Sequence, residues 1–202
     1  NVSSNQLTNL DISNQPSLIS INCSTNNLTS LNLDNNHVLK EIVCFSNNLQ
    51  KLKIPEFTNE LYTLYFHNNP MLEYLYLKNN GDESSQISSY LNNTSPFFNT
   101  NVKYICADDF EIDGIKNVLQ YWGINTINVN SYCSFVPGGS YNTIPGNVRF
   151  DENGNGCDTN DEFFQNMKLK IDDGTNSGTT FVENNGNYNF YTQSGNFTVT
   201  AL

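Results

Sequence analysis

A short phrase that recurs from Leu7 to Asn80 constrains the fold of this chain more than any other feature. It reads Leu-x-x-Leu-x-apolar-x-x-Asn, with Ile replacing the second Leu in some copies and the final Asn missing from others. The copies open at Leu7, Leu18, Leu28, Leu39, Leu49, Leu61 and Leu72. One such phrase cannot bury its own apolar edge and must stack on the next, so the repeat predicts a solenoid.

The structural unit is expected to be a pair of phrases, about 21 residues long, because Cys23 and Cys44 occupy a position where the neighbouring phrases carry Leu or Ile. The last two apolar positions of each phrase are two residues apart, which is the spacing of a strand. The closing Asn can bond backbone groups left unpaired where the strand turns away. We therefore predict a right-handed leucine-rich-repeat solenoid. A β-sandwich of short amphipathic strands is the alternative, although it would not keep this register.

Composition limits the partners of the chain. Its 202 residues suffice for a sizeable core in one or two domains. With 20 acidic and 9 basic residues the formal net charge is -11, which disfavours nucleic acid and anionic lipid. The charge suits divalent cations or neutral, hydroxyl-rich ligands, or simply provides solubility. We find no signal peptide or apolar run long enough to span a membrane, and we expect a piece of a longer protein that does not insert into membranes.

Five cysteines fall into three groups. Cys23 and Cys44 should point inward as small hydrophobic side chains, with a disulfide between adjacent coils as the alternative. Cys106 and Cys133 flank the segment after the repeats, and a disulfide between them would clasp it; two separate thiols are equally compatible with the sequence. Cys157 has no evident mate.

The segment after the repeats is predicted to form a terminal cap. Residues 55–60 disturb the phrase, and residues 78–101 form a polar stretch that we interpret as a long connection on the convex side. Residues 102–106 read as a strand and residues 124–129 as another. Between them we expect a helix that has Asp113 as its N-cap and ends at Gly123. The apolar face of this helix comprises Ile115, Val118, Leu119 and Trp122.

Three segments follow from this pattern. Residues 1–135 are predicted to be the solenoid with its cap, residues 136–146 a Pro- and Gly-rich linker, and residues 147–202 a small, truncated β-sandwich. Short strand-like runs in the last segment are separated by turns such as Asn184-Asn-Gly186. The predicted fold class is therefore mainly β, with one capping helix.

A loop in the last segment has the spacing of a calcium site. Counted from Asp151, oxygen-bearing side chains stand at positions 1, 3, 5, 9 and 12, with Gly156 at position 6. The predicted Ca²⁺ ligands are Asp151, Asn153, Asn155, Thr159, Glu162 and the backbone carbonyl of Cys157. Asp158 and Asp161 are alternative ligands, and an acidic Asn/Gly turn without metal is the alternative to a calcium site. Affinity should be weak, roughly micromolar to millimolar, because few charges face the ion.

The repeats resemble the 21-residue leucine-rich repeats of surface proteins exported by Bacteroidetes bacteria. The motifs Tyr104-Ile-Cys-Ala-Asp-Asp109, Asn130-Ser-Tyr-Cys-Ser-Phe135 and Gly146-Asn-Val-Arg-Phe-Asp-Glu-Asn-Gly-Asn-Gly-Cys-Asp158 are similar to the segment after such repeats in flavobacterial type IX secretion cargo. The last segment also resembles the calcium-loop B-type repeats of Gram-positive surface adhesins. These resemblances imply an extracellular or outer-cell-surface adhesin that meets the type IX secretion machinery during export.

No catalytic constellation is evident. His37 and His67 lack a nucleophile or carboxylate at a fixed spacing. Asp108, Asp109 and Glu111 could act as paired carboxylates, but we expect them to be a solvated strand end. The sequence therefore predicts a protein that is not an enzyme.

Outward-facing aromatic side chains are the expected binding residues. They are Phe45, Tyr65, His67, Tyr74 and Tyr76. Aromatic rings beside amide and hydroxyl groups suit a glycan or a protein partner, although scattered exposed aromatics without function are equally compatible. We predict a non-enzymatic binding or adhesion protein. The alternatives are a structural stalk that presents other domains, or an accessory module of a secreted hydrolase.

Overall fold

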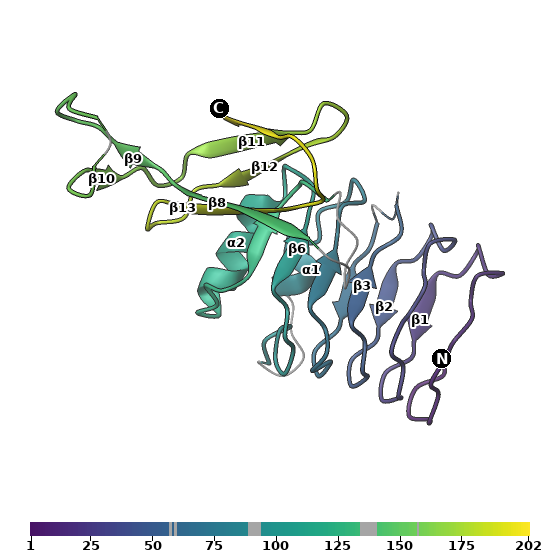
Figure 1. Cartoon of the computed structure of the whole chain (residues 1–202). Helices are drawn as coiled ribbons and strands as arrows, with labels where there is room; N and C mark the ends of the chain where they lie inside the picture. The colour runs from purple at the N-terminus through teal and green to yellow at the C-terminus, as the bar shows by residue number, and fades with distance from the viewer. Residues whose placement is uncertain (57, 59, 89–93, 134–140, 157) are drawn as a thin grey trace. The chain divides into compact units, whose positions relative to one another are not determined.

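The computed structural model describes residues 1–56, 58, 60–88, 94–133, 141–156 and 158–202. Figure 1 shows a chain built mainly from β-strands with little helix, which confirms the predicted mainly β class. It divides into two compact units, Asn1–Val129 and Asn130–Leu202. Residues 134–140, which include the start of the predicted linker, lie outside the described part. No helix in the described ranges is long and apolar enough to cross a membrane.

The first unit contains two sheets of short, mainly parallel strands. One sheet has the order β1 (Ser20–Asn22), β2 (Glu41–Val43), β4 (Thr63–Tyr65). The other has the order β3 (Lys51–Lys53), β5 (Tyr74–Tyr76), β6 (Tyr104–Cys106), β7 (Asn128–Asn130). Ile21 pairs with Ile42, and Ile42 pairs with Leu64, so each step along the sheet is one pair of phrases. Figure 1 shows these strands stacked beside one another.

The repeated apolar positions form the core of this unit. Side chains that are 0 or 1% exposed include Leu28, Leu33, Leu39, Ile42, Leu49, Leu52, Ile54, Leu64, Leu72, Leu75 and Leu77. Burying each such side chain contributes roughly 1.5–3 kcal/mol. Cys23 and Cys44 are free, fully buried thiols in the same core, as expected of small hydrophobic side chains. Burial raises the pKa of the Cys23 thiol to about 11. Burial also raises the pKa of the Cys44 thiol well above its ordinary value.

A ladder of buried asparagines ties successive coils together. Asn47 accepts the Leu28 N–H at 3.0 Å and donates to the carbonyls of Cys23 and Cys44, each at 3.1 Å. Asn69 repeats the arrangement one coil later: it accepts the Leu49 N–H at 3.0 Å and also donates to the Cys44 carbonyl. Each side chain therefore satisfies the backbone of its own coil and of the preceding one, which explains the Asn that closes the phrase.

The turns that precede the ladder asparagines share one backbone conformation. Thr25, Ser46 and Asn68 have φ values of 55°, 54° and 54°. This left-handed conformation costs energy for residues other than glycine, and least for Asn. The repeat stabilises this backbone conformation, because the asparagine that follows each of these residues is hydrogen-bonded to buried backbone carbonyls.

Two helices lie in the last part of the first unit. The polar stretch contains α1 (Ser84–Ser88), with Ile87 fully buried. The predicted helix is α2 (Ile112–Tyr121), which buries Ile112, Ile115 and Leu119. Glu111, not Asp113, is its N-cap, because helical geometry begins earlier than the apolar spacing indicated. Trp122 follows as the C-cap and is half-buried, and Gly123 ends the helix at a φ of 68°.

The second unit is built from antiparallel strands. β11 (Lys168–Asp172) pairs with β12 (Ser177–Phe181) and β14 (Thr198–Ala201). β8 (Asn142–Asn147) pairs with β13 (Asn187–Thr192), and β9 (Arg149–Phe150) pairs with β10 (Glu162–Phe163). The core cluster comprises Tyr132, Leu169, Ile171, Val182 and Phe190. The 21-residue period is absent, as the sequence indicates for this segment.

Candidate functional site

The sheet β1-β2-β4 presents an ordered set of outward side chains, which we call the outer lane. Its members are Ser20, Asn22, Glu41, Val43, Phe45, Thr63, Tyr65 and His67, whereas Ser24 on the same side is buried. The strand register aligns Ser20, Glu41 and Thr63 in one row, and Asn22, Val43 and Tyr65 in the next. The parallel ladder continues beyond the strands, because Thr25 N donates to Phe45 O and Ser46 N to His67 O. The lane therefore holds three of the predicted binding residues together.

Phe45 and His67 form the most ordered aromatic feature of the lane. Their ring centroids are 4.7 Å apart and their planes differ by 8°, which is a stacked pair. Both side chains are half-buried. Burial lowers the pKa of His67, so the imidazole is neutral at pH 7 and the pair offers an uncharged flat surface.

Glu41 is held in a fixed orientation at the other end of the lane. Ser20 Oγ donates to Glu41 Oε2 at 2.7 Å, and the Tyr62 hydroxyl donates to Oε1 at 2.9 Å. These two hydrogen bonds lower the pKa of Glu41, so the carboxylate stays ionised. The Tyr62 ring, 56% exposed, lies beside the lane. The alternation of side chains along the strand did not identify Tyr62 as a binding residue, because Tyr62 lies one position before β4 begins.

The other two predicted binding residues lie on the other sheet. Tyr74 is only 7% exposed and pairs in register with the fully buried Tyr104. Tyr76 is half-buried, and burial raises its pKa. Strand alternation shows which side of a sheet a residue takes, not whether that side is covered. The structure therefore does not place Tyr74 and Tyr76 on the outer lane.

The predicted calcium loop connects β9 to β10. Asp151 Oδ1 accepts the Gly154 N–H at 2.8 Å, and Oδ2 accepts the Gly156 N–H at 2.9 Å. Asn155 N donates to Asn153 Oδ1 at 3.0 Å. Gly154 and Gly156 have φ values of 71° and 96°, so glycine is required by the turn as the spacing indicates. Cys157, a predicted carbonyl ligand, lies outside the described residues.

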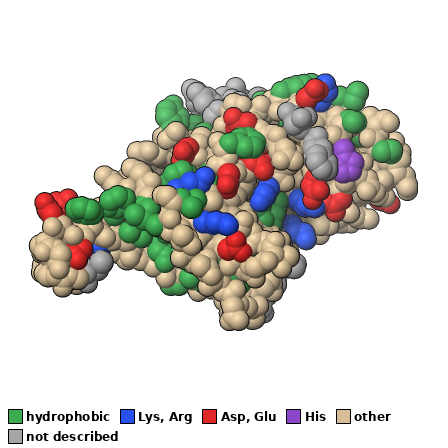
Figure 2. Space-filling view, turned by 90° about the horizontal axis from the view of Figure 1, so that it is seen from above, with side chains coloured by type: hydrophobic (Ala, Val, Ile, Leu, Met, Phe, Trp, Pro, Cys, Tyr) green, Lys and Arg blue, Asp and Glu red, His purple; other side chains and the backbone are tan. Residues whose placement is uncertain are grey.

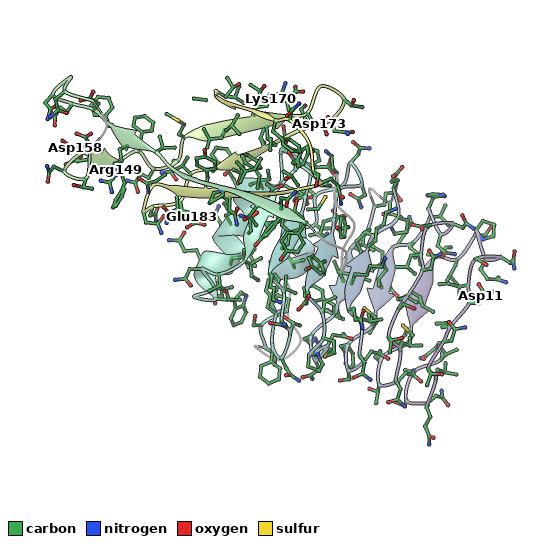
Figure 3. The ribbon with its side chains drawn as sticks, viewed as in Figure 1. Asp11, Arg149, Asp158, Lys170, Asp173 and Glu183 are labelled. Atoms are coloured by element: carbon green, nitrogen blue, oxygen red, sulfur yellow. The ribbon has the colours of Figure 1, made fainter. Side chains whose placement is uncertain are left out.

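The described part of this loop fits a metal only in part. Glu162 is exposed on β10, opposite Phe150. The Thr159 and Asp161 carbonyls accept hydrogen bonds from Arg149 Nη1 at 3.1 and 2.7 Å. Figure 3 shows Arg149 and Asp158 on this hairpin. In the described ranges, no three acidic, His or Cys side chains converge closely enough to hold a metal ion.

An open depression of about 410 Å³ lies beside the same hairpin. Its lining residues are Arg149, Thr159, Asp161, Glu162, Phe163, Gln165 and Asn184. The Arg149 guanidinium lies over the Phe163 ring, 4.5 Å from its centroid. Hydrogen bonds to the Thr159 and Asp161 carbonyls and a cation–π contact with the Phe163 ring hold the positively charged Arg149 side chain at the base of the loop.

The acidic residues Asp108, Asp109 and Glu111 were expected to be a solvated strand end, and this prediction is wrong for two of them. Asp108 is 7% exposed and Glu111 1% exposed, and Glu83 beside them is also 1% exposed. Only Asp109 is exposed. Folding of the cap over these side chains buries them, which local polarity cannot indicate. Glu83 was missed because it sits in an otherwise polar stretch.

Cys106 and Cys133 are both disulfide-bonded. Their pairing with each other stays a prediction.

Comparisons with known proteins give little further information. No protein-family model matches the sequence, and no curated protein matches it significantly. Among solved structures, the chain is similar to the functional domain of InlJ from Listeria monocytogenes, which is described as including a cysteine ladder. The identity is 20% and the TM-score 0.29, over 95% of this chain and 51% of that one. This chain thus spans about half of that protein's length, and a likeness at this level defines neither fold nor function.

Proposed function

We propose that the chain is a non-enzymatic binding module of a secreted or cell-surface protein, in which the outer lane is the binding face. In this proposal the first unit is a leucine-rich-repeat solenoid and the second a small β-sandwich. The observation that carries it is the stacked Phe45–His67 pair, aligned by the strand register with Tyr65 and the oriented Glu41 carboxylate. Fixed rings and a fixed carboxylate reduce the ordering cost of binding.

A neutral glycan is the ligand class that this surface favours. Aromatic faces stack on sugar rings, and Glu41 together with Ser20, Asn22 and Thr63 offers hydrogen bonds to hydroxyl groups. Figure 2 shows acidic and basic side chains interspersed on the face drawn. The net charge of -11 disfavours acidic ligands. A protein partner is the competing occupant, and it is distinguished by the experiment below.

An extracellular location and export through the type IX secretion machinery belong to the same proposal. They rest on the resemblance of the repeats and cap motifs to Bacteroidetes surface proteins. Fractionation of the native host tests this point: we expect the full-length protein at the outer cell surface or in the medium, and recovery from the cytoplasm alone would overturn it.

Removing the ring surface is expected to weaken binding strongly. The test compares the full chain with a Tyr65→Ala/His67→Ala double variant on an array of immobilised neutral oligosaccharides and on immobilised host-surface proteins. Loss of two central aromatic contacts should weaken binding at least about 30-fold, since each is expected to contribute roughly 1 kcal/mol or more. The matched control is Tyr121→Ala, an exposed tyrosine on α2 (74% exposed) that should bind like the parent.

Each array result has a defined meaning. Binding to oligosaccharides that the double variant loses supports the glycan-binding lane. Binding only to protein would change the proposed ligand from a glycan to a protein, and the outer lane would remain the proposed binding face. No binding to either class, or equal binding by parent and double variant, contradicts the proposal and favours a structural spacer.

We also propose that the β9–β10 loop binds Ca²⁺, with Asp151, Asn153 and Asn155 supplying side-chain oxygens. Glu162 would have to turn toward the loop, because the described residues do not yet converge. The loop spacing and its two left-handed glycines support this proposal.

Calcium should protect the loop against hydrogen exchange in the full chain. We expect protection of residues 149–163 at roughly millimolar Ca²⁺. Asp151→Asn should weaken the apparent affinity at least about 10-fold, because it removes the charge nearest the ion. Glu152→Gln, at a non-ligand position of the same loop, is the control. If saturating Ca²⁺ and excess chelator give the same exchange, the loop is a turn without metal.

A further inference from the structure

Three carboxylates are buried together in the loops that precede α1 and α2. Glu83 and Glu111 are each 1% exposed and Asp108 is 7% exposed. Burying even one carboxylate is unfavourable unless hydrogen bonds or a cation compensate its charge. The hydrogen-bond partners of each oxygen therefore show where charge can be tolerated.

Backbone N–H groups compensate two of the three carboxylates. Asp108 Oδ2 accepts the N–H groups of Asn79 and Asn80 at 2.9 and 2.7 Å. Glu111 Oε1 accepts the Asp108 N–H at 2.8 Å, and its Oε2 accepts the Glu83 N–H at 3.0 Å. Two donors each is the arrangement that stabilises an ionised carboxylate.

Glu83 lacks this compensation. Its Oε1 accepts one hydrogen bond, from Asn79 Nδ2 at 3.0 Å. Its Oε2 is buried and has no hydrogen-bond partner. An ionised Glu83 would therefore leave a buried charged oxygen unsatisfied, next to two carboxylates that are better solvated by the backbone.

Acidic side chains are the charged groups that raise the pKa of Glu83 further. Asp82 and Asp108 face it from the two loops, and both oppose its ionisation. The helix α1 (Ser-Ser-Gln-Ile-Ser) carries no charged side chain. The helix α2 carries two charged side chains in this region: Asp113 is exposed and Lys116 is half-buried. In the described ranges, no group of three or more acidic, His or Cys side chains has metal-binding geometry.

We propose that this cluster is a proton-binding site: Glu83 carries a proton in the native state at and below neutral pH, and its loss to water loosens the packing of α1 against α2. Burial raises the pKa of Glu83 to about 7 and that of Glu111 to about 8, so the cluster holds a proton near neutral pH. The hydrogen bonds place that proton on Glu83, because Glu111 accepts two backbone N–H groups and Glu83 Oε2 accepts none. The proton removes the charge that Oε2 cannot satisfy.

The sign of the pH effect follows from linkage. An unfolded glutamate loses its proton near pH 4.5, whereas folded Glu83 holds it until about pH 7. Between these values the folded state binds a proton that the unfolded state does not, so the free energy of unfolding falls as pH rises. The fall ends once folded Glu83 has ionised.

Thermal unfolding of the full chain against pH tests the proposal. The fluorescence of Trp122, the single tryptophan, reports the first unit. From about pH 5.5 to about pH 8.5 we expect the unfolding temperature to fall by roughly 5–10 °C. Glu83→Gln imitates the protonated acid and should flatten this dependence, leaving the variant more stable than the parent at the higher pH. The exposed control Glu56→Gln should keep the parent's dependence.

Two further comparisons make the outcome decisive. Glu111→Gln should lose stability at every pH, because its amide N–H₂ would face backbone donors. Hydrogen exchange of α1 and α2 in the unmodified chain, corrected for intrinsic rates, should accelerate above pH 7 relative to β2. The proposal is overturned if the parent is pH-independent, if Glu83→Gln keeps the parent slope, or if α1 and α2 show no selective acceleration.

Discussion

Replacing Asn47 with alanine is expected to destabilise the first unit by about 3 kcal/mol, although the substitution removes only a short polar side chain. The Leu28 N–H loses its acceptor in a fully buried position, and the Cys23 and Cys44 carbonyls each lose one of two amide donors. An unsatisfied buried donor alone costs about 1–3 kcal/mol. Because the hydrogen bonds join two coils, the interface between coils weakens as well.

Urea unfolding followed by Trp122 fluorescence measures this loss. Asn48→Ala is the matched control, since Asn48 is adjacent and exposed, and it should change the free energy of unfolding by less than about 0.5 kcal/mol. Asn47→Asp keeps the acceptor for Leu28 but turns an ionised oxygen toward two carbonyls, so it should be at least as unstable as Asn47→Ala. Equal stability of the Asn47 and Asn48 variants would contradict the ladder.

Replacing Gly178 with alanine is expected to cost the second unit at least about 3 kcal/mol. A Cβ at this position would lie 2.3 Å from the Tyr132 N and 2.5 Å from the Ser131 carbonyl carbon. Both are backbone atoms, and the contact is fixed because Ser131 N donates to Thr179 O at 3.0 Å. The strand must separate from this segment or distort, which would also disturb Tyr132 in the core.

Hydrogen exchange of the full chain resolves this effect by unit. Peptides from β11, β12 and β14 should lose protection in Gly178→Ala, while those from β2 and β4 stay unchanged. Gly195→Ala is the control: its Cβ would meet nothing closer than 3.4 Å, so we expect a change of less than about 1 kcal/mol. Unchanged protection in Gly178→Ala would show that the close approach is relaxed at no cost.

The period of the repeats made the first unit predictable. A recurring Leu and a closing Asn indicate both the buried face and the way backbone groups are satisfied, and Leu28, Leu49 and Asn47 occupy those roles. The same reasoning placed Phe45 and His67 on one face, since alternation along a strand is fixed by covalent geometry. Their stacking depends on side-chain rotamers and could not be read from the sequence.

The burial of a side chain by a segment that is distant in the sequence could not be predicted. Tyr74 obeys strand alternation yet is buried, and Glu83 sits among polar residues yet is enclosed. Both outcomes depend on which distant segment packs over the position. The start of α2 at Ile112 was missed for a related reason: Glu111 occupies the N-cap position without a side-chain capping hydrogen bond, and its carboxylate binds the Asp108 N–H instead.

The measurement that tests the binding role most directly is a hydrogen-exchange footprint of the full chain, with and without a saturating amount of the neutral oligosaccharide that binds best on the array. Our account predicts protection confined to residues 41–46 and 62–68, which carry Glu41, Phe45, Tyr65 and His67. Protection only in the second unit, protection confined to β5 and β6, or the absence of any oligosaccharide that binds would contradict the assignment of the outer lane as the glycan-binding face.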